Sequence, residues 1–155
     1  MYGYEECDSR SEAEFRFERE CAGYTVAMLA DALGVRTGTV KRWENPKYAE
    51  KPSPRAWELV DSLYERLLRA VDESLDTVGS IGDETGEPPA VVEVAYRRGG
   101  KREAEPHEVL NAIARAVAMA LHALGYEARA VWDGSATSGG KAAEARRKTG
   151  DGIPV

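Results

Sequence analysis

The chain has 155 residues, of which 43% are hydrophobic, so it is long and apolar enough for one ordinary domain or two small ones. Its 27 acidic and 21 basic residues give a net charge of -6, which excludes a protein that is basic along its whole length.

The longest apolar run is interrupted by Arg115 and His122, and no signal-like segment opens the chain, so we expect a soluble, cytoplasmic protein without membrane contact. Cys7 and Cys21 have no histidine or second cysteine nearby, so we expect free thiols and neither a metal nor another cofactor.

The basic residues are concentrated in one stretch of this acidic chain. Residues 36–55 hold six basic side chains against two acidic ones. The six are Arg36, Lys41, Arg42, Lys47, Lys51 and Arg55. A local basic face of this kind is what contact with DNA phosphates needs, so the distribution of charge matters more than the total.

Three short helices are expected in the first half of the chain. The first covers residues 11–22 and ends at Gly23, which suits the left-handed conformation after a helix. Its acidic residues indicate a solvated face; they are Glu12, Glu14, Glu18 and Glu20. The second begins after the capping residue Thr25 and ends at Gly34, and the third covers residues 37–43 before a proline breaks it.

A longer apolar pattern follows a polar loop. Ser53 and Pro54 are typical of a helix start, and apolar residues then recur at helical spacing over about 24 residues, as one helix or two. Residues 77–89 are rich in glycine, proline and acidic residues, which indicates a linker. The chain is therefore predicted to divide into an N-terminal domain, residues 1–76, and a second domain after the linker.

The second domain, residues 90–133, is predicted to be a β-α-β unit. Residues 91–97 and 126–132 have the composition of strands, and residues 106–124 place apolar side chains on one face of a helix. Trp132, at the end of the second strand, suits either a core position or a dimer interface. A unit of two strands and one helix buries little apolar surface, so we expect it to dimerise.

The end of the chain, residues 134–155, has the composition of a flexible tail in which residues 141–148 could form a short helix. The predicted fold class is therefore α+β, with helices in the first domain and a small β-α-β dimerisation unit in the second.

The spacing of structural residues between positions 22 and 63 supports a more specific interpretation. Thr25 caps one predicted helix, Gly34 allows a tight turn after it, and Val40 and Trp43 lie on the inner face of the next. Further matching positions are Leu29, Ala30, Leu33, Val35, Glu44, Asn45, Pro52, Ser53 and Pro54. Because of these residues, the stretch between positions 22 and 63 resembles the Cro-repressor-like (XRE) helix-turn-helix family. The resemblance implies a lambda-repressor-like domain of five helices that binds double-stranded DNA with its third helix in the major groove.

Because Val40 and Trp43 face inward, other residues of that third helix point outward and form the expected reading surface. The candidates for base reading are Thr37, Gly38, Lys41 and Arg42. Arg42 is the chief candidate because a guanidinium can donate two hydrogen bonds to guanine. The candidates for phosphate binding are Arg36, Thr39, Asn45 through its backbone amide, Lys47 and Lys51. The resemblance also implies a structural ion pair between Arg19 and Glu44.

Two positions depart from the pattern of the family. Val26 stands where a glutamine often binds phosphate, and Gly38 leaves one base-reading position without a side chain. Gly38 also weakens the helix by about 1 kcal/mol relative to alanine. The reading surface is therefore expected to be smaller than usual.

The predicted function is a homodimeric transcriptional repressor that reads an inverted-repeat operator. The order of the two domains also resembles that of anti-CRISPR-associated repressors. Two alternatives stay open: an antitoxin-type protein whose second domain holds a toxin, and an adaptor whose first domain binds protein instead of DNA. The sequence has no nucleophile elbow, phosphate-binding glycine loop or zinc-protease signature, so we do not expect an enzyme.

Overall fold

The computed structural model describes residues 10–100, 105–134 and 145–148 of the chain. Within these residues the chain forms five helices and a three-stranded sheet, so the predicted α+β class is confirmed. The chain divides into two compact units, Met1–Arg66 and Leu67–Val155. None of the helices in the described residues is both long enough and apolar enough to cross a membrane.

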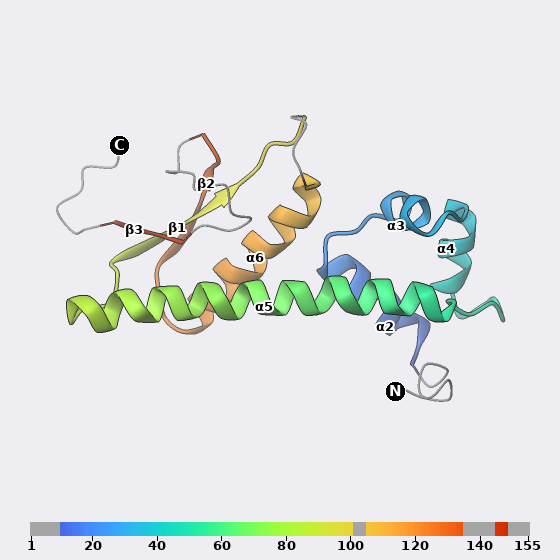
Figure 1. Cartoon of the computed structure of the whole chain (residues 1–155), viewed down its shortest axis with the longest axis horizontal. Coiled ribbons are helices and arrows are strands. Elements are labelled where there is room, and N and C mark those ends of the chain that lie inside the picture. Colours follow the sequence, from blue (N-terminus) through green and yellow to red (C-terminus); the bar gives the residue numbers. More distant parts are fainter. Residues whose placement is uncertain (1–9, 101–104, 135–144, 149–155) are drawn as a thin grey trace. The chain divides into compact units, whose positions relative to one another are not determined.

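The first unit contains three short helices and the beginning of a long one (Figure 1). They are α2, Glu12–Cys21; α3, Val26–Leu33; α4, Thr37–Trp43; and α5, Pro54–Thr85. The Ser11 Oγ accepts a hydrogen bond from the Glu14 amide at the start of α2, and the Thr25 Oγ1 accepts one from the Met28 amide at the start of α3, each at 3.1 Å. Gly34 ends α3 with φ of 67°, in the left-handed region where glycine alone is unstrained, so the helix limits predicted from Thr25 and Gly34 are confirmed.

Aromatic side chains form the core of this unit. Phe15 of α2 is fully buried, and its ring meets those of Trp43 and Trp57 edge-on at centroid distances of 6.1 and 5.0 Å. Leu29 of α3 and Val40 of α4 complete the buried cluster, together with residues of α5. The prediction that Trp43 lies on the inner face of its helix is thus confirmed, and Trp57 is buried beside it.

Helix α5 corrects three predictions. It runs without a break from Pro54 to Thr85, so most of the predicted linker, residues 77–89, is helical. One helix therefore replaces the two that the five-helix domain required, and the units meet between Arg66 and Leu67 instead of after residue 76. Each glycine in this part of the helix disfavours the helical conformation by about 1 kcal/mol, but burial of the Val78 side chain offsets that cost.

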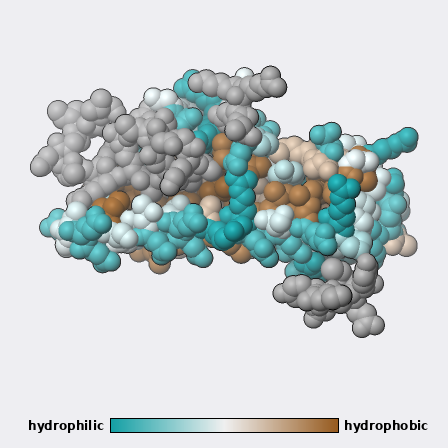
Figure 2. Space-filling view, in the orientation of Figure 1, coloured by the Kyte–Doolittle hydropathy of each residue, from teal (hydrophilic) through white to brown (hydrophobic). Residues whose placement is uncertain are grey.

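In the view of Figure 2, hydrophilic side chains are prominent along α5, as expected for an amphipathic helix.

The second unit contains the predicted β-α-β arrangement. Strand β1, Val91–Tyr96, leads through helix α6, His107–Ala123, to strand β2, Ala128–Trp132, which pairs with β1 in parallel. Helix α6 packs against both strands. The side chain of Asn111 fixes the end of β1, since its Oδ1 accepts from the Arg97 amide and its Nδ2 donates to the Arg97 carbonyl, both at 2.8 Å.

A third strand corrects the prediction for the end of the chain. Residues Ala145–Lys148 form β3, which pairs antiparallel with β1, so the strand order is β2-β1-β3. These four residues are therefore neither a flexible tail nor a helix, because pairing with β1 supplies partners for their backbone groups. The remainder of the predicted tail after residue 134 lies outside the described residues.

Candidate nucleic-acid interface

Helices α3 and α4 are joined by a turn of three residues and pack against each other. Gly34 opens the turn, and the Val35 amide donates to the Ala30 carbonyl at 2.9 Å, which closes it. On α4, Val40 and Trp43 are buried in the core. The opposite face of the helix must therefore be the face that meets solvent.

That outer face of α4 carries the predicted base-reading residues. Thr37, Lys41 and Arg42 are exposed, and Gly38 between them is half-buried. A Cβ added at Gly38 would lie 3.5 Å from the Arg42 Nη1, which is an ordinary contact. The helix thus brings the four predicted residues together on one surface, and Arg42 lies over the small Gly38 position.

Arg42 is not extended freely into solvent. Its Nε donates to the Glu50 Oε2 at 2.7 Å and its Nη2 donates to the Thr39 Oγ1 at 3.3 Å. Sequence reasoning placed Arg42 correctly on the outer face but did not find Glu50, which follows eight residues later across a loop. No local pattern signals a pair of this kind. The side chains are 44% and 46% exposed, so solvent screens their attraction and the pair can open at little cost.

Asn45 differs from its predicted role. Its backbone amide donates to the Arg42 carbonyl at 3.2 Å, so this N–H is already in use. Its side-chain Oδ1 accepts from the Lys47 amide at 3.0 Å, which shapes the loop after α4. The structure therefore assigns Asn45 a turn-forming role and leaves the exposed Lys47 side chain on that loop as the phosphate candidate.

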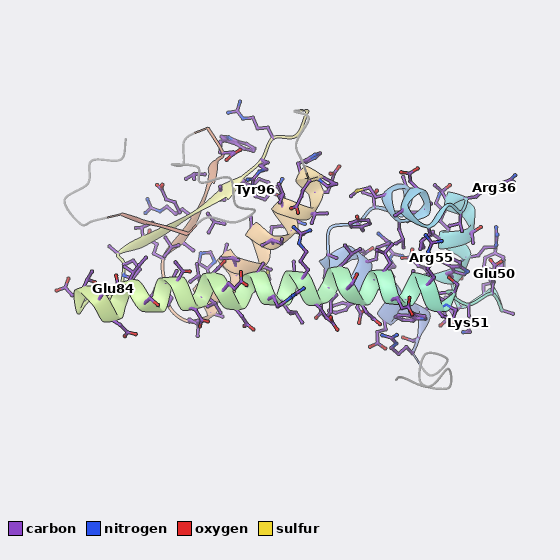
Figure 3. All side chains as sticks on the ribbon, viewed as in Figure 1. Arg36, Glu50, Lys51, Arg55, Glu84 and Tyr96 are labelled. Carbon is purple, nitrogen blue, oxygen red and sulfur yellow. The ribbon has the colours of Figure 1, made fainter. Side chains whose placement is uncertain are left out.

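Lys51 is held by a carboxylate of the first unit. Its Nζ pairs with the Glu12 Oε1 of α2, and this hydrogen bond lowers the pKa of Glu12 below its usual range. Arg36, Lys41 and Lys47 are exposed and have no carboxylate partner within the part of the chain that the structure describes. Figure 3 shows Arg36, Glu50 and Lys51 at the end of the unit that holds α4 and the start of α5.

The predicted ion pair between Arg19 and Glu44 is formed. The Arg19 Nε donates to the Glu44 Oε1 at 2.6 Å and the Nη2 donates to the Glu44 Oε2 at 3.2 Å, so the contact is bidentate. The third nitrogen, Nη1, donates to the Tyr24 carbonyl at 2.7 Å. Both charged side chains are less than a tenth exposed, and the pair ties α2 to the residue that ends α4.

A second charged cluster on α2 corrects the prediction of a fully solvated acidic face. Glu18 is only 9% exposed, and its Oε2 has no hydrogen-bond partner among the described residues. Asp61 of α5 lies beside it and accepts two hydrogen bonds from Arg10, at 2.7 and 3.1 Å. The Arg10 guanidinium also lies 3.8 Å from the centroid of the Trp57 ring. Burial, then the hydrogen bond and charge of Asp61, raise the pKa of Glu18 from 4.5 to about 7.

Comparison with known proteins gives no family model that matches the chain and no match among curated proteins. In the described residues, no group of three or more histidine, cysteine, aspartate or glutamate side chains is arranged to hold a metal ion. The interpretation of the α4 surface therefore depends on its own chemistry.

Proposed function

We propose that the protein is a sequence-specific transcriptional regulator of the Cro-repressor-like type, whose helix α4 enters the major groove of double-stranded DNA. One observation carries this proposal: the outer face of α4 collects Thr37, Lys41 and Arg42, while its inner face is locked into an aromatic core. Such a short, rigidly held helix with a basic outer face has the dimensions and chemistry for the major groove.

The proposed contacts divide into two kinds. Arg42 reads a guanine with two hydrogen bonds, for which it leaves Glu50, and Thr37 at the first turn of the helix reaches a neighbouring base edge or phosphate. Arg36 and Lys47 neutralise phosphates and position the helix without reading sequence, and Lys41 contacts a base edge or a phosphate. Lys51 also binds a phosphate if its ammonium group leaves the Glu12 carboxylate.

We further propose that the protein acts as a homodimer that reads an inverted repeat and represses transcription by excluding polymerase. Two copies of α4 would then contact half-sites about one helical turn of DNA apart. The exposed Met119 and Leu124 side chains of the second unit support this part of the proposal, since association of two copies would remove them from water.

Replacing Arg42 by alanine is expected to weaken binding to the preferred site by about tenfold to a hundredfold, as the loss of a bidentate base contact predicts. The site is first found by sequencing genomic fragments that the protein retains, and affinities are then measured by electrophoretic shift. Arg69→Ala removes another exposed arginine, from α5, and is expected to leave the affinity unchanged. The absence of any shift at low salt, on every fragment, would contradict the proposed function.

Replacing Glu50 by glutamine is expected to tighten binding by about threefold to tenfold, because a rim charge is worth up to about 1 kcal/mol or slightly more. The change frees Arg42 and removes a negative charge that repels phosphates. Titrations at several salt concentrations check this, since affinity should still fall steeply as salt rises. Weaker binding by Glu50→Gln would mean that the Glu50 carboxylate positions Arg42 for reading instead of restraining it.

A further inference from the structure

Four side chains of the second unit form a row where β1 and β2 end, three of them exposed and the fourth, Tyr96, half-buried. Tyr96 is the last residue of β1, Trp132 is the last residue of β2, and the two are register partners in the parallel ladder. Arg98 follows β1 by two residues, and Arg115 comes from α6. We call these four residues the aromatic-arginine row. Figure 3 labels Tyr96 on this unit.

The row is connected by direct contacts. The Tyr96 and Trp132 rings lie 6.2 Å apart between centroids, with an angle of 56° between their planes. The Arg98 guanidinium lies over the indole of Trp132, 4.9 Å from the ring centroid. The Arg115 Nη1 donates to the Tyr96 Oη at 2.9 Å. Each guanidinium is therefore held by an aromatic side chain and keeps further N–H groups for a ligand.

No carboxylate among the described residues pairs with the two arginines of the row. Neither Arg98 nor Arg115 has a carboxylate partner among the described residues, whereas the exposed Arg16, Arg42 and Arg129 each pair with a glutamate. Trp132 is 48% exposed, so a large apolar ring is left in water beside the Arg98 guanidinium. Of the two alternatives predicted for Trp132, a core position or a dimer interface, this exposure excludes a core position within the chain itself. The combination fits a ligand that has both an aromatic ring and negative charge.

The backbone after β1 turns tightly against the start of α6. Gly99 and Gly100 after β1 both have φ of 79°, and a Cβ on Gly99 would lie 2.9 Å from the His107 ring. Asn111 fixes the Arg97 backbone from both sides, so the start of this turn is rigid. The carboxyl ends of parallel strands, next to the start of the following helix, are where α/β units commonly bind ligands.

We propose that the aromatic-arginine row binds a nucleotide unit, with its base stacked on Trp132 and its phosphate held by Arg98 and Arg115. Base stacking on an exposed aromatic ring, next to arginines that contact phosphate, is the chemistry of binding to unpaired nucleic acid. Two sources present this chemistry: a free nucleotide and a single-stranded segment of nucleic acid. The site is distinct from the α4 surface, and its ligand is unpaired, because bases within a duplex do not expose their faces.

The test measures binding of the full chain to adenosine monophosphate and to a fluorescein-labelled 12-nucleotide single strand, by calorimetry and fluorescence anisotropy. We expect Trp132→Ala to weaken binding by about tenfold or more, as the loss of one stacked base predicts. Trp132→Phe should keep part of the affinity, and Arg98→Gln or Arg115→Gln should lower both the affinity and its dependence on salt. Binding of the mononucleotide would identify a free nucleotide as ligand, and binding of the strand alone would identify nucleic acid; each outcome supports the site.

Two controls separate this site from other surfaces. Arg129→Ala removes a neighbouring arginine that already pairs with Glu127, and it should leave binding unchanged. Arg42→Ala should weaken duplex binding only, so the two proposals can fail independently. The proposal is overturned if neither probe binds the full chain, or if folded Trp132→Phe and Arg98→Gln variants bind as the unchanged protein does. It is also overturned if Trp132→Ala merely dissociates a dimer, because the row would then be a contact between two copies.

Discussion

Replacing Glu44 by alanine is expected to lower the free energy of unfolding of the first unit by about 3–5 kcal/mol, the usual result of breaking a buried ion pair on one side. The change removes both oxygens that accept hydrogen bonds from Arg19, at 2.6 and 3.2 Å, and leaves the buried guanidinium with only the exposed Glu20 carboxylate, 3.7 Å away. Chemical denaturation followed by tryptophan fluorescence measures the loss, because Trp43 and Trp57 lie in the same core.

The matched control for Glu44→Ala is Arg16→Ala, which breaks an exposed ion pair on the same helix. Arg16 and Glu20 are 61% and 50% exposed, so we expect a change below about 0.5 kcal/mol. A double replacement, Arg19→Met with Glu44→Leu, should recover most of the lost stability, since it removes both charges together. Equal effects of Glu44→Ala and Arg16→Ala would show that the buried pair contributes no more than a surface pair.

The stability of the first unit is expected to fall as the pH rises from about 5 to 8, because of Glu18. Its pKa is raised from 4.5 to about 7 in the folded protein, so between these values the folded state binds a proton that the unfolded state has lost. The stabilisation is complete below the unfolded value and is lost as the pH passes the folded value. One pKa unit corresponds to about 1.4 kcal/mol, which limits the loss to about 3 kcal/mol.

Denaturation curves of the Glu18→Gln variant check this prediction. Glutamine resembles the protonated carboxyl group and can donate a hydrogen bond to Asp61, so the variant should be more stable than the unchanged protein at pH 8. Glu14→Gln, at an exposed position of the same helix, controls for the general loss of one acidic group and should keep the pH dependence. A pH dependence that survives in Glu18→Gln would assign it to other groups.

The helix limits and the inner face of α4 could be predicted because their causes are local. Thr25 and Gly34 act within one turn of the residues that they cap, and Val40 and Trp43 follow helical spacing. The outer face of α4 follows from the same spacing, so the base-reading residues were predicted to lie together. Whether they contact DNA stays a prediction.

The errors all concern contacts between residues far apart in the sequence or burial by tertiary packing. Glu50 restrains Arg42 across a loop, and Glu18 is buried beside Asp61, 43 positions away, although its helical position suggested solvent. Strand β3 exists because β1 offers it a partner, which its own composition does not reveal. In the predicted linker, local glycine propensity indicated a break, but packing of Val78 favoured continuation of the helix.

The unbroken helix α5 has a consequence for attempts to separate the two units. The unit boundary lies between Arg66 and Leu67, after the thirteenth residue of a helix that ends at Thr85. A protease needs a locally extended segment, and a helix interior does not supply one, so limited digestion should spare this boundary. Genetic truncation there would expose up to four unpaired carbonyls at the cut end of the helix. A fragment meant to represent the first unit should therefore extend through Thr85.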